Sequence, residues 1–119
     1  DVAPSRGLGD VYKRQRRQKV TGVHMFCLGD KTCTAWCSNF APLYDIPEEC
    51  ATGTSNGALT YYLYRYGLVQ PDRENVFIQG EHMRRLSEIR SRLTVEKGDA
   101  LIRVGGRAVL SLSGEIYAD

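Results

Sequence analysis

The sequence predicts an α+β fold in which a curved, mostly antiparallel sheet surrounds one central helix. Only residues 55–66 repeat apolar side chains with the spacing of an amphipathic helix. Most other segments are short runs of strand-forming residues separated by glycine-containing turns, which favours antiparallel neighbours. A single, mostly apolar helix among many strands is typical of an α+β domain.

The first half of the chain predicts a β-hairpin. Residues 20–28 and 32–40 are rich in β-branched and aromatic side chains, and Gly29-Asp30-Lys31 supplies the turn between them. A loop with Pro42 and Pro47 follows. We therefore expect two adjacent strands before the helix.

The helix is expected to run from Ser55 to Tyr66. Thr54 or Ser55 is a suitable N-cap, and Gly67 favours the end of a helix. Because Arg65 is its only charged residue, we expect other structure to wrap the helix. Its apolar stripe consists of Ala58, Leu59, Tyr62, Leu63 and Tyr66.

Further strands are expected after the helix, and turns are marked by Gly98-Asp99 and Gly105-Gly106. The strand-like runs are residues 75–79, 88–95, 101–104 and 108–112. They complete the set of strands that we expect to curl around the helix.

Charge is distributed unevenly along the chain. Residues 1–19 contain six basic and two acidic side chains, whereas residues 20–119 contain ten basic and twelve acidic ones. Because the basic character stops where the apolar pattern begins, we expect no nucleic-acid partner. Residues 7–15 resemble translated adapter sequence, so we expect residues 1–19 to be a non-native or disordered head.

Hydropathy and cysteine spacing exclude several classes of protein. No apolar run is long enough to span a membrane, and no apolar signal segment is visible, so we expect a cytoplasmic protein without a membrane partner. The four cysteines form no C-x-x-C pair, and neither histidine has ligand spacing to them, so we expect no metal. We expect three of them to be small core residues, namely Cys27, Cys33 and Cys37.

The segment from Glu48 to Ser55 combines an acidic pair, a thiol and small residues directly before the helix. A helix N-terminus presents unpaired N–H groups and the positive end of the helix dipole, and small residues let an anion approach them. The same field favours the thiolate of Cys50. The segment therefore indicates a carboxylate or phosphate site, with ordinary capping and turn chemistry as the alternative.

This segment resembles the signature of the PhzF-like family of phenazine-biosynthesis isomerases, E-D/E-x-A-T-G-S/T-x-x-G-A-L. Phe40-Ala41-Pro42, Gln79-Gly80 and residues 104–109 (VGGRAV) resemble further family elements in the same order. The resemblance covers residues 20–119 and implies one half of the two-domain diaminopimelate epimerase-like fold. We expect residues 20–119 to be its C-terminal domain, with the N-terminal domain missing from this sequence.

The resemblance implies cofactor-independent proton transfer at a carbon of a small, amino-acid-like carboxylate. Glu49 holds the position of the family's assisting acid, and Cys50 that of an acid/base in related epimerases. The residues that would bind the substrate are Thr52, Gly53, Thr54 and Ser55, with Gln79 and Gly80 near the site. Ser38 replaces an Arg of many relatives. The principal catalytic Glu belongs to the N-terminal domain, so we expect this fragment to be inactive alone.

Three functions stay open. They are a PhzF-like isomerase, a two-cysteine amino-acid epimerase or racemase, and a non-catalytic small-anion-binding module of the same fold. The upstream sequence separates the first two, because it shows Glu or Cys at the partner position. The expected partners are a small carboxylate substrate and the N-terminal domain; no cofactor is expected, and homodimer formation is left open.

Overall fold

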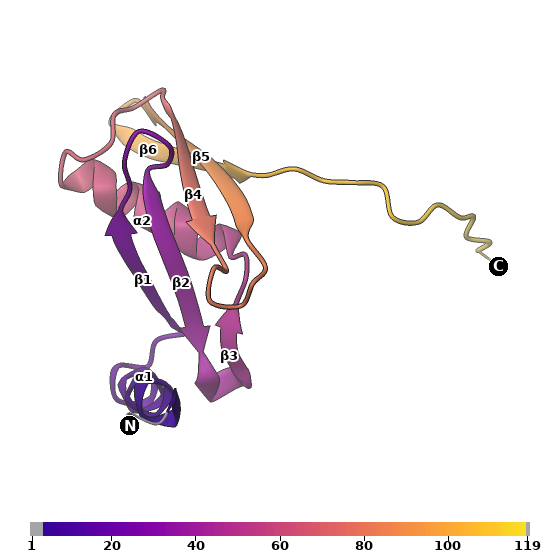
Figure 1. The fold of residues 1–119 in the computed structure, drawn as a ribbon. Coiled ribbons are helices and arrows are strands. Elements are labelled where there is room, and N and C mark those ends of the chain that lie inside the picture. Colours follow the sequence, from indigo (N-terminus) through magenta and orange to yellow (C-terminus); the bar gives the residue numbers. More distant parts are fainter. Residues whose placement is uncertain (1–3, 119) are drawn as a thin grey trace.

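The computed structural model describes residues 4–118 and confirms the α+β class (Figure 1). Two helices, one short 3-10 turn and six strands follow one another along these residues. Their order is α1 (Pro4–Gln18), β1 (Val23–Leu28), β2 (Ala35–Ala41), η1 (Pro42–Tyr44), β3 (Ile46–Glu49), α2 (Gly53–Arg65), β4 (Glu74–Gln79), β5 (Ser87–Glu96) and β6 (Asp99–Gly105).

The six strands form one mixed sheet with the order β1-β2-β4-β5-β6, and β3 pairs with β2 beside this path. The pairs β1–β2, β2–β3, β4–β5 and β5–β6 are antiparallel, whereas β2 and β4 run parallel. The expected hairpin and the mostly antiparallel character are therefore confirmed. The parallel pair arises because α2 lies between β3 and β4 and returns the chain, so that β4 lies beside the first half of β2 and runs in the same direction.

The core lies between the sheet and one face of α2. Along β2, every second residue is buried, which is the alternation of a strand with one face toward the core. The buried apolar cluster consists of Ala35, Cys37, Leu59, Leu63, Val69, Phe77 and Ile89. The same inward face of β2 also carries Asn39, which is only 5% exposed and begins the polar region described below.

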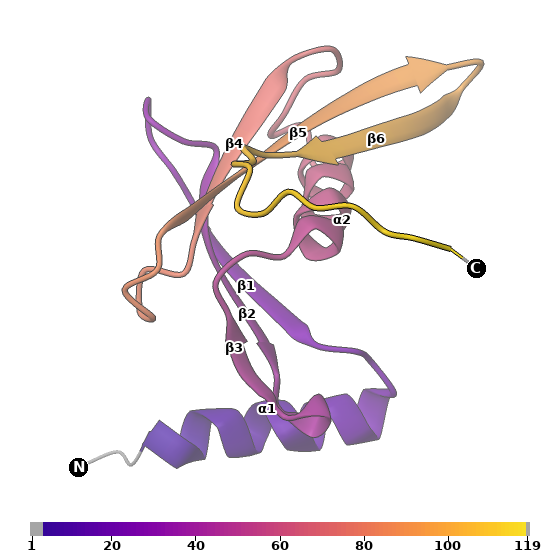
Figure 2. The ribbon, with the colours of Figure 1, turned by 90° about the vertical axis from the view of Figure 1, so that its right-hand side faces the viewer.

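Helix α2 starts two residues earlier than predicted, and the sheet covers only one side of it (Figure 2). Leu63 is fully buried, whereas Tyr61, Tyr62 and Tyr66 are exposed. The expectation that other structure wraps the helix is wrong for this tyrosine face. The tyrosine face stays exposed because α2 packs against β5 and β6 on one side only.

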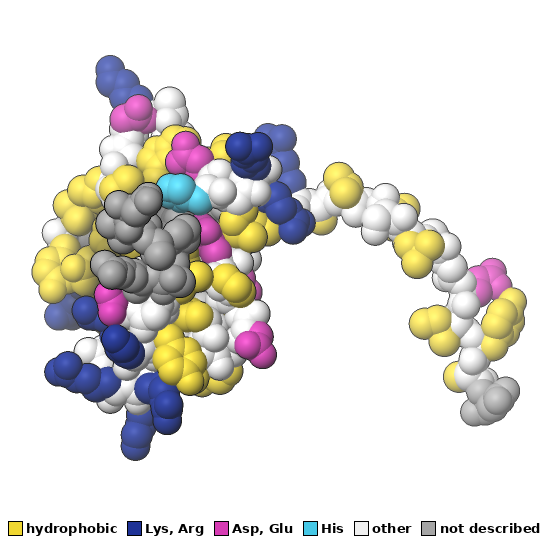
Figure 3. Space-filling model, turned by 60° about the horizontal axis from the view of Figure 1, so that its bottom comes forward, with side chains coloured by type: hydrophobic (Ala, Val, Ile, Leu, Met, Phe, Trp, Pro, Cys, Tyr) yellow, Lys and Arg dark blue, Asp and Glu magenta, His cyan; other side chains and the backbone are white. Residues whose placement is uncertain are grey.

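Two strand predictions need correction. Residues 46–49 form β3 although Pro47 and two glutamates make them a poor strand by composition; β3 lies beside the path of the main sheet. Residues 108–112 were expected as a strand, yet they belong to an extended segment without regular structure. Its apolar side chains, including Val109, Leu110 and Leu112, are exposed along a projection from the body (Figure 3).

The head of the chain is a helix rather than a disordered segment. Helix α1 lies at the lower end of β2, beside η1 (Figure 1), and Gln15 is fully buried there. The Gln15 side chain donates to the carbonyl of Thr21 and accepts from the backbone N–H of Leu43, at 2.7 and 3.0 Å. Residues 4–18 are thus helical where a non-native or disordered head was expected, while residues 1–3 lie outside the described residues.

Cys27 also differs from its prediction. Cys33 and Cys37 are buried, as expected, but Cys27 is exposed. β1 is an edge strand, and the last four of its six residues are exposed. Within the described part of the chain, neither helix is long and apolar enough to cross a membrane.

Candidate functional site

The end of β3 holds the carboxylate of Glu49 in a fixed position. β3 pairs with β2 so that Glu49 lies opposite Asn39. The side-chain amide of Asn39 donates to Glu49 Oε2 at 3.1 Å, and the hydroxyl of Thr52 donates to the same oxygen at 2.6 Å. Both bonds end on Oε2, so Oε1 is the carboxylate oxygen that carries neither of them.

The first turn of α2 is left open by this arrangement. Thr52 is the N-cap residue, with extended backbone angles, yet among the described residues its side chain makes no capping bond. Its hydroxyl donates to Glu49 instead. The first N–H groups of a helix have no partner within the helix, so those of Gly53, Thr54 and Ser55 stay available to an anion.

Two cavities flank this helix end. The larger, of about 930 Å³, brings together polar residues from β1, β2, β3 and α2, with an apolar wall from Phe26, Leu59 and Tyr62. Its polar lining includes His24, Asn39, Glu49, Thr52, Thr54 and Ser55. The site residues Glu49, Thr52, Thr54 and Ser55 predicted from the sequence therefore share one cavity.

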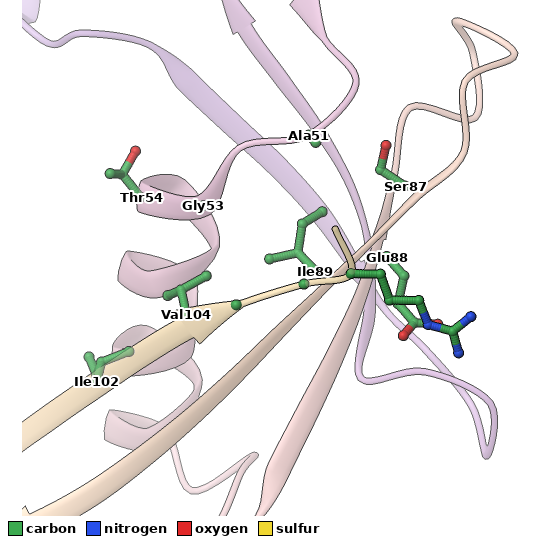
Figure 4. A pocket seen from close by; sticks show the side chains of 11 residues that line it. Ala51, Gly53, Thr54, Ser87, Glu88, Ile89, Ile102 and Val104 are labelled. Carbon is green, nitrogen blue, oxygen red and sulfur yellow. The ribbon is translucent and has the colours of Figure 1, made fainter. Parts of the chain in front are cut away.

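The second cavity, of about 780 Å³, lies on the other side of the helix end (Figure 4). Gly53 and Thr54 line it at the start of α2, Ile102 and Val104 come from β6, and Ser87 lies across from them. A Cβ atom on Gly57 would meet Val104 at 3.1 Å, so this glycine lets β6 approach the helix closely. Thr54 belongs to both cavities, which places the open helix end between them.

Gln79 lies behind the site rather than in it. It is fully buried, and its amide donates to the Glu49 backbone carbonyl at 2.8 Å and to the Thr52 hydroxyl at 2.9 Å. Its own carbonyl accepts from Asn56 at 2.9 Å. Gln79 therefore joins the end of β4 to the segment between β3 and α2, and it holds that segment in place.

Gly80 and Cys50 are neighbours through their backbones. Gly80 has φ +87°, and a Cβ there would collide with the carbonyl oxygen of Arg85 and meet that of Cys50 at 2.9 Å. Gly80 thus allows two chain segments to touch. Cys50 is half-buried and is not among the described residues that line either cavity.

Sequence reasoning missed three polar residues of the larger cavity and its floor. His24 lies on its wall, 3.1 Å from the Asn39 side-chain oxygen and 3.2 Å from that of Asn56. Asn56 is fully buried and also donates to the Thr52 carbonyl at 2.9 Å. Asn39 could have been noticed as a polar residue at an inward position of β2, and Asn56 as one on the buried face of α2.

No group of three or more His, Cys, Asp or Glu side chains within residues 4–118 gathers with the geometry of a metal site. The polar groups of the larger cavity are instead suited to hydrogen bonding and proton transfer, because a carboxylate lies beside an open helix end.

The chain belongs to the phenazine biosynthesis-like protein family, whose sequence model matches residues 10–114. The match confirms the PhzF-like resemblance and indicates an isomerase- or epimerase-like function. No curated protein matches the chain.

Proposed function

We propose that this chain forms one half of a cofactor-independent isomerase that moves a proton at a carbon atom of a small, amino-acid-like carboxylate. Glu49 is the acid/base of this half. The N–H groups of Gly53, Thr54 and Ser55 bind the carboxylate of the substrate. The second acid/base comes from an N-terminal domain of the full-length protein, which closes over the cavity.

The chemistry needs a base beside the carbon and a fixed position for the substrate. Glu49 accepts the proton from carbon as a carboxylate and returns a proton as the carboxylic acid. The helix end holds the negative charge of the substrate, because its N–H groups and dipole favour an anion there. An adjacent hydroxyl, that of Thr54, supplies a further donor at the same end of the cavity.

One observation carries the proposal. The Thr52 hydroxyl, which would ordinarily cap α2, donates to Glu49 at 2.6 Å. A single side chain thereby orients the carboxylate and leaves the helix end open, and both features face one cavity. Ordinary capping, the alternative reading of this segment, would direct the hydroxyl to the N–H groups of α2.

The roles of three other residues are revised in the proposal. The hydroxyl of Thr52 has two protein partners, so we assign it and Gln79 to holding Glu49 rather than to binding the substrate. Cys50 is absent from the described lining of both cavities, which favours the isomerase over the two-cysteine epimerase. A binding module without catalysis would need no oriented carboxylate.

Exchange of substrate hydrogen with solvent deuterium tests the proposal. The full-length protein is incubated in D₂O with a mixture of amino acids and other small carboxylates, and mass spectrometry detects deuterium at carbon. Glu49→Gln keeps the size and polarity of the side chain but removes its ionisable group. We expect the exchange rate to fall about 100-fold or more.

The comparison variant is Glu48→Gln, which removes the same charge at the neighbouring residue outside the hydrogen bonds to Thr52 and Asn39. It should keep most of the exchange activity. Equal rates in the wild type and in Glu49→Gln would show that Glu49 does not transfer the proton. Carboxylate binding without any exchange in the wild type would support the binding module instead.

A further inference from the structure

A closed ring of hydrogen bonds lies beneath the larger cavity. Three of its members, Asn39, Asn56 and Gln79, are at most 5% exposed, while His24 is half-buried on the cavity wall. In order around the ring, its six side chains are His24, Asn39, Glu49, Thr52, Gln79 and Asn56. Such a ring has a direction at each step, set by which group donates.

The direction of the three amides follows from fixed acceptors. The Gln79 nitrogen lies 2.8 Å from the Glu49 backbone carbonyl, and the Asn56 nitrogen lies 2.9 Å from that of Thr52. Rotating either amide by half a turn would bring two oxygens together. The Asn39 nitrogen is fixed in the same way by the Glu49 carboxylate at 3.1 Å.

His24 therefore faces two acceptors. Its Nδ1 is 3.1 Å from the Asn39 oxygen, and its Nε2 is 3.2 Å from the Asn56 oxygen. A neutral imidazole has one N–H, so one of these contacts would join two lone pairs. The imidazolium form donates at both nitrogens and satisfies both contacts.

We propose that His24 is an imidazolium cation that pairs with the Glu49 carboxylate through two directed arms of hydrogen bonds. The short arm runs through Asn39, and the long arm runs through Asn56, Gln79 and Thr52. Both arms start at His24 as donor and end at Glu49 Oε2 as acceptor. His24 is thus a positioning residue that keeps Glu49 oriented as the ionised base.

The surroundings of the ring agree with this pairing of charges. The titratable groups that line the cavity with His24 are Glu49 from β3, Tyr44 from η1 and Tyr62 from α2. Among these described residues, Glu49 is the only carboxylate, so it is the counter-charge of His24. The pairing of charges is independent of the reaction, whereas its use in catalysis rests on the proposed function.

Nuclear magnetic resonance tests the inference on the 119-residue chain. Long-range ¹H–¹⁵N correlation spectra distinguish an imidazolium from either neutral tautomer, and His82, which is exposed, serves as the internal reference. The spectra are recorded at about pH 7.5, roughly one unit above the ordinary pKa of a histidine. We expect the imidazolium pattern for His24, with His24→Gln assigning the signals.

Two variants test the coupling to Glu49. Glu49→Gln removes the charge at the end of both arms and keeps an oxygen acceptor there, so His24 should become neutral at the same pH. Glu48→Gln removes the neighbouring charge outside the ring and should leave His24 an imidazolium. A neutral His24 in the wild type, or an imidazolium that persists in Glu49→Gln, would overturn the pairing.

The consequence for catalysis is measured separately, in the full-length protein. His24→Gln should lower the rate of deuterium exchange about tenfold or more, since it weakens hydrogen bonds to a charged group. His82→Gln should exchange at the wild-type rate. An unchanged rate in His24→Gln would overturn the positioning role. If wild-type His24 is neutral while Glu49→Gln still loses exchange, the proposed function is supported and the pairing of His24 with Glu49 is overturned.

Discussion

The hydroxyl of Thr52 could cap the first N–H groups of α2, or it could bond to the side chains of Glu49 and Gln79. Which of these partners it binds decides whether the first turn of α2 is open to the cavity. It donates to Glu49 and accepts from Gln79, and both bonds are shorter than 3 Å. A bond to a carboxylate is stronger than one to a helix N–H, which explains why capping is given up. The cap residue therefore orients the Glu49 carboxylate, and the first N–H groups of α2 are left without a side-chain cap.

Cys37 gives a prediction about pH. Burial raises the pKa of this thiol above its ordinary 9.0 to about 12, with a further contribution from the nearby Cys27 and Cys33. Folding thus favours the neutral thiol, and this contribution to stability is fully present below about pH 9. It is lost as the pH rises toward 12.

The free energy of unfolding should therefore decrease between pH 9 and pH 12, and part of this decrease should disappear in Cys37→Ala. Urea unfolding at a series of pH values measures it. Cys27→Ala is the control, because this thiol is exposed. An identical pH dependence in the wild type and in Cys37→Ala would contradict the assignment.

Among the secondary-structure elements, α1 and β3 could not be predicted from the composition of their segments. The mostly polar sequence of α1 has only a short apolar stripe, Leu8 and Val11, and the buried side chain within residues 7–18 is the amide of Gln15. β3 contains a proline and two glutamates and pairs only with β2 in the described sheet. In both cases a side-chain or backbone hydrogen bond replaces the apolar pattern on which sequence reasoning relies.

Substitution of Gln15 tests the attachment of α1. Gln15→Leu keeps the helix propensity and the volume but leaves the Leu43 N–H and the Thr21 carbonyl without their partner. We expect the chain to lose about 1–3 kcal/mol in free energy of unfolding, the cost of unsatisfied buried polar groups. Gln18→Leu, at an exposed position of the same helix, should change it by less than about 0.5 kcal/mol. Equal effects would show that the buried amide does not hold α1.

For the whole molecule, periodicity was sufficient to predict α2, the first hairpin and the strands β4 to β6, because each has an alternation or an apolar stripe. The parallel pairing of β2 and β4 depends on contacts distant in sequence, which no local pattern reveals. The same holds for the site. Glu49 and the helix end were visible as a motif, whereas Asn39 and Asn56 became functional candidates only when folding brought them around His24.

The two candidate acid/base residues, Glu49 and Cys50, are adjacent in sequence, but only Glu49 lines the larger cavity. Glu49 faces it, while Cys50 packs its backbone against Gly80. The rate of deuterium exchange in Cys50→Ser, compared with that in Glu49→Gln, therefore tests the account most directly. Both variants are measured in the full-length protein with the same carboxylate mixture.

The account predicts that Cys50→Ser retains exchange within about threefold of the wild type, while Glu49→Gln loses about 100-fold or more. A serine hydroxyl does not ionise near neutral pH, so a catalytic thiol would not survive this change. The reverse order, with exchange lost in Cys50→Ser and kept in Glu49→Gln, would contradict the assignment of Glu49 and favour the cysteine-dependent epimerase.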